Sequence, residues 1–343
     1  MGRFRYITVI LALVVVAVGL VAATGAAGGE RQGPPQDLQG QALGLFEIDG
    51  VVFTDIDEQS GRLVVGVENR GLARSVQARA NALGIPVSAV SVVETKPIVF
   101  ATTLRDNVRP LKGGLQIWWQ KKAGSGIAYV CTLGFNASRG EVAGFVTNSH
   151  CTATQGSVEG TKHYQPTGGV ANLVGTETAD PAFFSCARKK KCRYSDSAFS
   201  ALASGVSADL GYLERTTGPN NGFLTIAGSF RISSEASGNA PVGATVNKVG
   251  RTTGWTQGTV LYSNVNVGVS GTNIIMLGQD MVAAGVGGGD SGSPVFGQPN
   301  EAGDVTLQGI LWGGSTDGAM FVYSPMVNVQ RSSELGDLTT TAP

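Results

Sequence analysis

The feature that most constrains the fold is a regular alternation of short β-type segments with turn residues, which begins near residue 115. Clear examples of these segments are residues 127–133, 142–147, 244–249, 259–262, 273–277, 305–312 and 320–323. Gly, Asn, Ser and Thr separate them, and no long helical periodicity appears. The chain contains 50 glycines and only 15% charged residues, which suits many turns and few surface helices. The pattern therefore predicts an all-β sandwich or barrel.

A glycine-rich stretch at residues 287–294, Gly-Gly-Gly-Asp-Ser-Gly-Ser-Pro, is the strongest candidate for a functional site. Glycine allows positive φ and close approach of other atoms. A tight turn here could expose the Ser291 hydroxyl and direct neighbouring backbone N–H groups at one point. Acyl transfer requires that combination of a nucleophile and an oxyanion hole. The alternative is a polar turn without chemistry, but a motif of this length that continues into Val295 and Phe296 favours a function.

A nucleophilic serine needs a base, and the chain has only two histidines. His150 directly follows the segment 142–147 and precedes a cysteine, as expected of a residue held at the end of a strand. His163 lies in a polar, loop-like segment, typical of a satisfied or solvated side chain. His150 is therefore the candidate base.

The base in turn needs a carboxylate that orients its imidazole. Asp196 begins the sequence Asp-Ser-Ala-Phe before a β-type segment, whereas its rival Asp180 precedes a proline in a turn-like setting. The spacing also favours Asp196, which lies 46 residues after His150 and 95 residues before Ser291.

These motifs together resemble the active-site signatures of the chymotrypsin-like (trypsin-fold) serine proteases, over about residues 113–335. The segment 249–258, which contains Gly-Arg-Thr-Thr-Gly, is similar to the bacterial streptogrisin and alpha-lytic branch. The resemblance implies an all-β, double six-stranded antiparallel β-barrel with the site between the barrels. It implies a Ser-His-Asp triad of Ser291, His150 and Asp196, and an oxyanion hole made by the N–H groups of Gly289 and Ser291. It implies no cofactor.

The resemblance also implies a disulfide pairing. Four cysteines alone allow three pairings. In the family a disulfide joins the strand before the histidine loop to the residue after the histidine, which matches Cys131 with Cys151 and leaves Cys186 with Cys192. The second pair would enclose a basic loop at residues 188–191. That loop could bind an acidic substrate or polymer, or it could be a solvated surface.

Substrate preference is expected to be small or apolar. The position six before the nucleophile, aspartate in trypsins, is Gly285, and no acidic residue occurs at 281–289. Residues 309–314 resemble the strand that pairs with substrate, so Trp312, Gly313 and Gly314 are predicted to wall the primary pocket. Family members often have serine where Trp312 stands, so Trp312 could instead belong to the core. Asp290 is expected to be the buried partner of a cation rather than a catalyst.

The N-terminal region predicts export. Two arginines precede an apolar run at residues 7–23, and small residues follow. Residues 1–27 are therefore predicted to be a signal peptide, and the protein is predicted to be secreted. The alternative is a membrane anchor formed by residues 7–23. Residues 28–49, rich in Gly, Gln and Pro, read as a linker, and residues 336–343 as a tail.

Residues 50–112 are predicted to form a separate β-β-α-β unit. Its expected strands are 51–56, 63–67 and 90–93, with a helix over 72–83 that Gly84 and Pro86 end. Beside a protease domain this unit resembles the pro-regions of bacterial secreted family members, which assist folding and block the active site. The alternative is an accessory domain.

Three functions are compatible with these observations. The first is a secreted serine endopeptidase, made as a proenzyme and acting on proteins or peptides as a monomer. The second is a catalytically silent, protease-like binding module. The third is another serine hydrolase, such as an esterase, although the chain lacks a Gly-x-Ser-x-Gly elbow. Zero net charge implies no nucleic acid partner, and the absence of a CxxC pair or HExxH motif leaves a zinc site without support.

Overall fold

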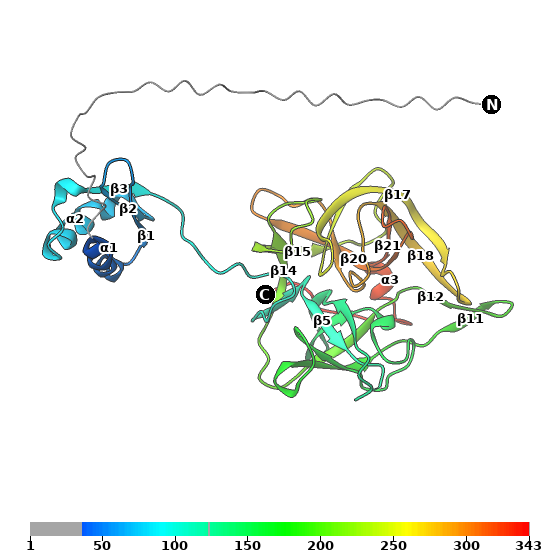
Figure 1. Ribbon diagram of the computed structural model, residues 1–343. Helices are drawn as coiled ribbons and strands as arrows, with labels where there is room; N and C mark the ends of the chain where they lie inside the picture. Colours follow the sequence, from blue (N-terminus) through cyan, green and yellow to red (C-terminus); the bar gives the residue numbers. More distant parts are fainter. Residues whose placement is uncertain (1–35, 123, 343) are drawn as a thin grey trace, which may run out of the picture. The chain divides into compact units, whose positions relative to one another are not determined.

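The computed structural model describes residues 36–122 and 124–342, so the predicted signal peptide and anchor lie outside the described residues. The chain divides into two compact units, with the boundary between Val99 and Phe100 (Figure 1). None of the described helices is both long and apolar enough to cross a membrane.

The first unit has the β-β-α-β order that the sequence predicts. Strands β1 (Val51–Ile56), β2 (Leu63–Val67) and β3 (Val90–Glu94) form one sheet in the order β1-β2-β3. The helix α2 (Ala73–Ala82) lies between β2 and β3 in the chain and buries Val76 and Ala80. Strands β1 and β2 pair antiparallel, and β2 and β3 pair parallel, as a helical crossover allows.

The predicted linker is wrong for the part of it that the structure describes. Residues 36–47 form α1 (Gln36–Ala42) and the 3₁₀ helix η1 (Leu43–Glu47). Ala42 and Leu45 are completely buried in the core of the first unit. The many glycines and glutamines of this segment suggested a linker, although its few apolar residues pack into the core.

The second unit contains the first of two closed β-barrels. Its strands are β5 (Gln116–Trp119), β6 (Tyr129–Thr132), β7 (Phe135–Arg139), β8 (Val142–Thr147), β9 (Lys162–Tyr164), β10 (Leu173–Ala179) and β13 (Ala198–Leu202). They pair in the order β6-β5-β9-β10-β13-β8-β7. Only two residues separate β6 from β7, so these two form one bent strand that closes a six-stranded ring.

The second barrel is also a ring of six strands. Its strands are β16 (Thr245–Gly250), β17 (Gly254–Gly268), β18 (Ile274–Ala283), β19 (Pro294–Phe296), β20 (Asp304–Gly314) and β21 (Phe321–Pro325). Strand β21 pairs with both β18 and β20, and β19 pairs with both β16 and β20. The ring β16-β17-β18-β21-β20-β19 thus closes on itself. The predicted double six-stranded barrel is confirmed.

Further strands extend the second barrel into an eleven-stranded sheet. They are β4 (Leu111–Gly113), β11 (Phe184–Ala187), β12 (Lys190–Arg193), β14 (Ala208–Thr216) and β15 (Ile226–Glu235). The short helix α3 (Met326–Val329) follows β21 and buries Met326 and Val329. Short 3₁₀ turns occur at η2 (Arg70–Leu72), η3 (Val87–Ala89), η4 (Ser149–Cys151) and η5 (Val170–Asn172).

Two predicted boundaries need correction. The first unit ends near residue 99 and not near 112, because Leu104 and Leu111 are completely buried in the core of the second unit. The predicted tail is also part of the fold. Leu338 joins the same core, and the backbone of Thr339 exchanges hydrogen bonds with Ser138 on β7.

Candidate active site

The Ser291 loop, residues 287–294, is a succession of tight turns. The N–H of Asp290 donates to the carbonyl of Gly287 at 3.0 Å, and the N–H of Ser293 donates to that of Asp290 at 2.9 Å. Gly289 has φ +98°, a conformation that favours glycine. The N–H groups of Gly289 and Ser291 have no hydrogen-bond acceptor among residues 36–122 and 124–342. These two backbone donors therefore remain available at this loop.

Hydrogen bonds to β6 attach the Ser291 loop to the first barrel. The N–H of Thr132 donates to the carbonyl of Ser291 at 2.7 Å, and its hydroxyl donates to the carbonyl of Gly289 at 2.9 Å. Gly292 has φ +91°, and a Cβ there would lie 2.2 Å from the carbonyl oxygen of Thr132. Only glycine allows the two barrels to approach this closely.

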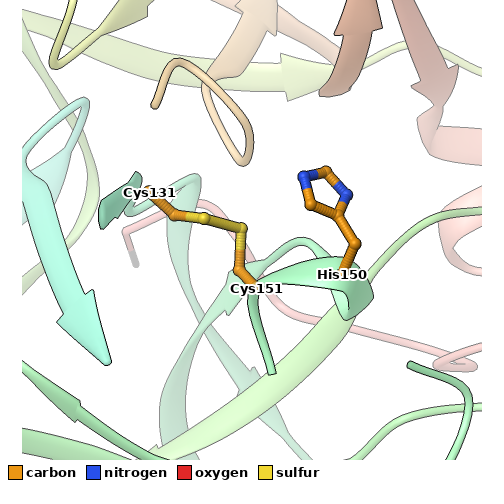
Figure 2. A group of neighbouring side chains, drawn as sticks. All are labelled: Cys131, His150 and Cys151. Atoms are coloured by element: carbon orange, nitrogen blue, oxygen red, sulfur yellow. A yellow bond between two sulfur atoms is a disulfide. The ribbon is translucent and has the colours of Figure 1, made fainter. Parts of the chain in front are cut away.

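His150 lies on the turn η4, directly after β8, and a disulfide holds this turn. Cys151 bonds to Cys131 of β6, with 6.3 Å between their Cα atoms. Figure 2 shows this disulfide beside the turn that carries His150. The sulfurs and an imidazole nitrogen lie within 4.8 Å of one another, the spacing of a metal site. Because the two sulfurs are bonded to each other, this group is not a set of metal ligands.

The buried carboxylate of Asp196 holds His150 through two contacts. One carboxylate oxygen lies 2.5 Å from Nδ1 of the imidazole, and the other accepts the backbone N–H of His150 at 3.1 Å. Gln155 donates to the second oxygen at 3.1 Å. The amide of Asn148 donates to the carbonyl of Asp196 at 2.6 Å, and the N–H of Asp196 donates to the hydroxyl of Ser324 at 3.2 Å. The carboxylate is thus fixed in place, and it fixes the ring.

This contact changes the pKa of both groups. Burial lowers the pKa of His150, but the charge of Asp196 and its hydrogen bond outweigh burial, so the net pKa lies above 6.5. Burial raises the pKa of Asp196, yet the charge and hydrogen bond of His150 lower it more, and the net pKa lies below 3.8. About 35% of the His150 side chain is exposed, so the ring can meet a ligand while its partner stays covered.

The structure brings the three predicted residues to one region. Ser291 is hydrogen-bonded to Thr132, whose neighbour Cys131 is bonded to Cys151, the residue after His150. In the described part of the chain no hydrogen bond joins the Ser291 hydroxyl to His150. The two loops are therefore held together by the backbone and the disulfide.

Asp290 has the structural role that the sequence predicts. Its carboxylate lies 3.2 Å from Nζ of Lys248, and both side chains are completely buried. It also accepts the N–H groups of Gly287, Thr252 and Thr253. Burial lowers the pKa of Lys248 by more than Asp290 raises it. The pair links the Ser291 loop to β16, and the hydrogen bonds of Asp290 link it to the turn after β16.

The two rival residues have structural surroundings. Asp180 is buried, lies 2.9 Å from Arg193 and accepts the hydroxyl of Ser149 at 2.8 Å. His163 is completely buried on β9, between the carbonyl of Cys151 and the hydroxyl of Ser200, at 3.0 and 2.9 Å. Both ring nitrogens of His163 have partners, as one of the two predicted alternatives requires. The prediction that His163 lies in a loop is wrong, because it lies on a strand. Burial lowers the pKa of His163 to about 4.

A cavity of about 270 Å³ opens beside Ser291. Its walls carry no charged side chain: Val286, Gly287, Gly288, Ser291, Leu311, Gly313, Gly314, Ser315, Thr316 and Gly318. Asp317, which lies between the lining residues Thr316 and Gly318, accepts the hydroxyl of Ser315 and the N–H of Ala319. Gly313 and Gly314 thus line the same cavity as Ser291.

Gly285 does not line this cavity. Its carbonyl accepts the hydroxyl of Thr256 at 2.9 Å, and it borders a separate hollow. The next residue, Val286, turns toward the cavity as its N–H donates to the carbonyl of Gly318 at 3.0 Å.

A second cavity, of about 690 Å³, adjoins the first. The two share the wall formed by residues 313–316, and the larger one extends past His150 to the ends of β17 and β18. Trp312 lines it and is 9% exposed, packed with Met276 and Val322. Its Nε1 donates to Gln279 at 2.8 Å. Trp312 is therefore both a core residue and a cavity wall.

The second disulfide, Cys186–Cys192, is also present, and it closes the β11–β12 hairpin. Sequence reasoning identified both disulfides but missed the supports of the site. Thr132, Gln155 and Lys248 belong to no short motif, and each lies far along the chain from the residue it holds. These three supporting residues can be identified only once the spatial neighbours of the site residues are known.

No model of a known protein family matches the sequence. The structure is similar to Thermobifida fusca protease A, with 21% identity and a TM-score of 0.45, over 68% of this chain and 98% of that chain. It is similar to Nocardiopsis protease at 23% identity and a TM-score of 0.46, over 67% and 98%. The Cellulomonas bogoriensis chymotrypsin has 22% identity and a TM-score of 0.45, over 68% and 98%.

Proposed function

We propose that this protein is a secreted serine endopeptidase that cleaves peptide bonds through an acyl-enzyme. The observation that carries the proposal is the contact between the imidazole of His150 and the buried carboxylate of Asp196, 2.5 Å apart, beside the loop of Ser291. A carboxylate in this position selects the tautomer that leaves Nε2 free to accept a proton, and stabilises the imidazolium once it forms.

In the proposed reaction Ser291 attacks the carbonyl carbon of the scissile bond while His150 takes the hydroxyl proton. The negative charge that develops on the carbonyl oxygen is stabilised by the N–H groups of Gly289 and Ser291, which have no acceptor among the described residues. His150 then protonates the leaving amine. Water, deprotonated by His150, attacks the acyl-enzyme and releases the acid. Asp196 orients His150 throughout.

The cavity beside Ser291 supports a small or apolar residue on the acyl side of the cut bond. Its walls are apolar or uncharged, and a buried cation of the substrate would find no partner there. The strand that ends at Gly314 would pair with the substrate backbone, as the resemblance implies. A preference for Arg or Lys over Leu or Phe in a peptide panel would contradict this assignment.

We further propose that the first unit is a pro-region that assists folding and blocks the site until it is removed. Residues 98–100 are the most accessible candidate for the processing site. Ile98 and Val99 are 79% exposed and Phe100 is fully exposed. By contrast, Leu111, next to the predicted end of the first unit at residue 112, is completely buried. N-terminal sequencing of the mature protein tests this: a first residue beyond 110 would contradict it.

A fluorophosphonate probe tests the central proposal. We expect one adduct, on Ser291, found by intact mass and peptide mapping, and no adduct in the His150→Ala variant. The same spectrum reports whether the first unit has been removed. A processed, folded chain that forms no adduct would contradict the endopeptidase and support the silent binding module. Adduct formation with hydrolysis of esters but not of casein would support the esterase.

A further inference from the structure

The β11–β12 hairpin carries the densest positive charge of the described chain. Arg188, Lys189, Lys190 and Lys191 are consecutive and exposed. None of the four forms an ion pair within residues 36–122 and 124–342, and the hairpin contains no acidic residue. The whole chain has zero net charge, so the positive potential of this cluster is local and does not come from an excess of positive charge over the whole protein.

The hairpin is held in one place. The Cys186–Cys192 disulfide crosses it, and β12 pairs in parallel with the start of β18, where Lys191 lies opposite Ile274. The N–H of Lys191 donates to the carbonyl of Asn273 at 2.9 Å. Figure 1 shows the hairpin beside the end of the β17–β18 pair.

The same end of β18 lines the larger cavity. Thr272, Ile274 and Met276 are among its walls, which continue past Trp312 to His150 and to Gly313. A peptide whose acyl-side residue fills the small cavity would therefore cross Gly313 into the larger, mainly apolar cavity. Its more N-terminal residues would then reach the strand to which the basic hairpin is paired.

The backbone conformation of Lys189 is an unfavourable one for a lysine. Lys189 has φ +60° in the two-residue turn between Ala187 and Lys190. Glycine and asparagine adopt this conformation most readily, and other residues are uncommon there. A positively charged lysine therefore occupies a position whose backbone conformation favours the uncharged residues glycine and asparagine.

We propose that the hairpin is a charge-selective subsite, which directs the protease to substrates with acidic residues several positions N-terminal to the cut bond, separated from it by an apolar segment. This inference rests on the proposed endopeptidase function and adds the class of substrate. Acidic side chains would pair with the exposed cations, and the apolar segment would fill the larger cavity. The interaction strengthens binding and the encounter rate, not the chemical step.

The test compares paired peptides that differ only in two Glu or two Gln residues, placed at successive positions N-terminal to an apolar segment. At low ionic strength we expect the best Glu peptide to have about tenfold higher kcat/KM than its Gln partner, mostly through KM, since each exposed ion pair contributes little alone. Salt should reduce the gain, because exposed charges are screened.

A variant with all four cations replaced, Arg188→Gln, Lys189→Asn, Lys190→Gln and Lys191→Gln, should reduce the gain to less than about twofold and leave the Gln peptide unchanged. Lys189→Asn alone, which suits the positive φ, should reduce it by about half. The control is Lys121→Gln with Lys122→Gln, two exposed cations of the first barrel, which should keep the full gain. An equal Glu gain in the hairpin variant, or no gain at any position, would overturn the proposal.

Two further readouts separate this inference from its alternatives. Hydrolysis of the Gln peptide reports the proposed function by itself, so a chain that cleaves it without a Glu gain refutes only the subsite. Binding of the dye-labelled Glu peptide to the Ser291→Ala variant, measured by anisotropy, needs no turnover and should be lost with the hairpin cations. If the hairpin variant instead loses only binding to phosphatidylserine vesicles, the hairpin contacts a membrane surface and the peptide assignment is wrong.

Discussion

The ammonium of Lys248 lies 3.2 Å from the carboxylate of Asp290, with both side chains completely removed from water. Asp290 immediately precedes Ser291, and Lys248 lies on β16 of the same barrel. The cation that pairs with Asp290 is therefore a side chain of the second unit itself. Asp290 does not need a chain terminus created by cleavage as its buried partner.

Removing the cation should damage the fold. Lys248→Met would leave Asp290 buried without its partner, and we expect the free energy of unfolding to fall by about 3–5 kcal/mol. Urea denaturation in the Ser291→Ala background, which prevents self-digestion, measures it. Arg231→Met is the control, because more than half of the Arg231 side chain is exposed where it pairs with Asp304, and it should cost less than about 1 kcal/mol. Equal losses in the two variants would contradict the burial argument.

Asp196→Asn should lower kcat about 10⁴-fold with little change in KM, because an amide at this position no longer favours the tautomer with Nε2 free. Peptide hydrolysis at saturating substrate measures the effect. Gln155→Ala, which removes only a donor to the same carboxylate, is the control and should retain most of the activity. A Gln155 variant as inactive as the Asp196 variant would show that the site is disrupted more generally.

The activity should rise with pH through the pKa of His150. The proton-accepting form is the neutral imidazole, and Asp196 raises the pKa of His150 above 6.5, so the half-maximal point of kcat/KM should lie above pH 6.5. Initial rates between pH 5 and pH 9, with a substrate that does not titrate, measure it. A midpoint below 6.5 would mean that burial outweighs the carboxylate.

The stability of the fold should depend on the protonation of His163, whose pKa is shifted in the opposite direction from that of His150. Its pKa in the folded state is about 4, while an unfolded imidazole has its ordinary value of 6.5. The unfolded state therefore binds the additional proton, and the stability due to this group falls by about 3 kcal/mol as the pH decreases from 6.5 to 4. Urea denaturation at pH 7 and pH 4.5 in the Ser291→Ala background measures it, and adding His163→Gln should reduce the difference between the two pH values. An unchanged difference would contradict the assignment.

Gly313 should be a test of substrate access. A Cβ at this position meets no atom within 4 Å, and the residue lines both cavities, so a valine there would fill the cleft without straining the fold. We expect Gly313→Val to lower kcat/KM about 100-fold, as misplaced substrates generally do. Gly238→Val, another glycine with open space around its Cβ, should be neutral. Fluorophosphonate labelling of the Gly313 variant should persist, which separates blocked access from a damaged nucleophile.

Much of the architecture follows from local sequence. The strands Val51–Ile56, Leu63–Val67 and Val142–Thr147 begin and end where the apolar alternation and turn residues predict. The site motifs are also local, because a glycine-rich turn and a histidine at a strand end each depend on neighbouring residues only.

Local sequence patterns were therefore enough to predict the all-β class, the β-β-α-β first unit and the candidates His150, Asp196 and Ser291. Features that depend on pairing between distant segments appear only in the folded chain. The tertiary structure placed residues 100–112 and the C-terminal residues within the second unit, turned Gly285 away from the cavity, and supplied Lys248 and Thr132 as supports. A hydrogen bond or buried ion pair between residues more than a hundred positions apart, such as Thr132 and Gly289, leaves no periodic or compositional signal in either segment, because neither residue type is unusual where it stands.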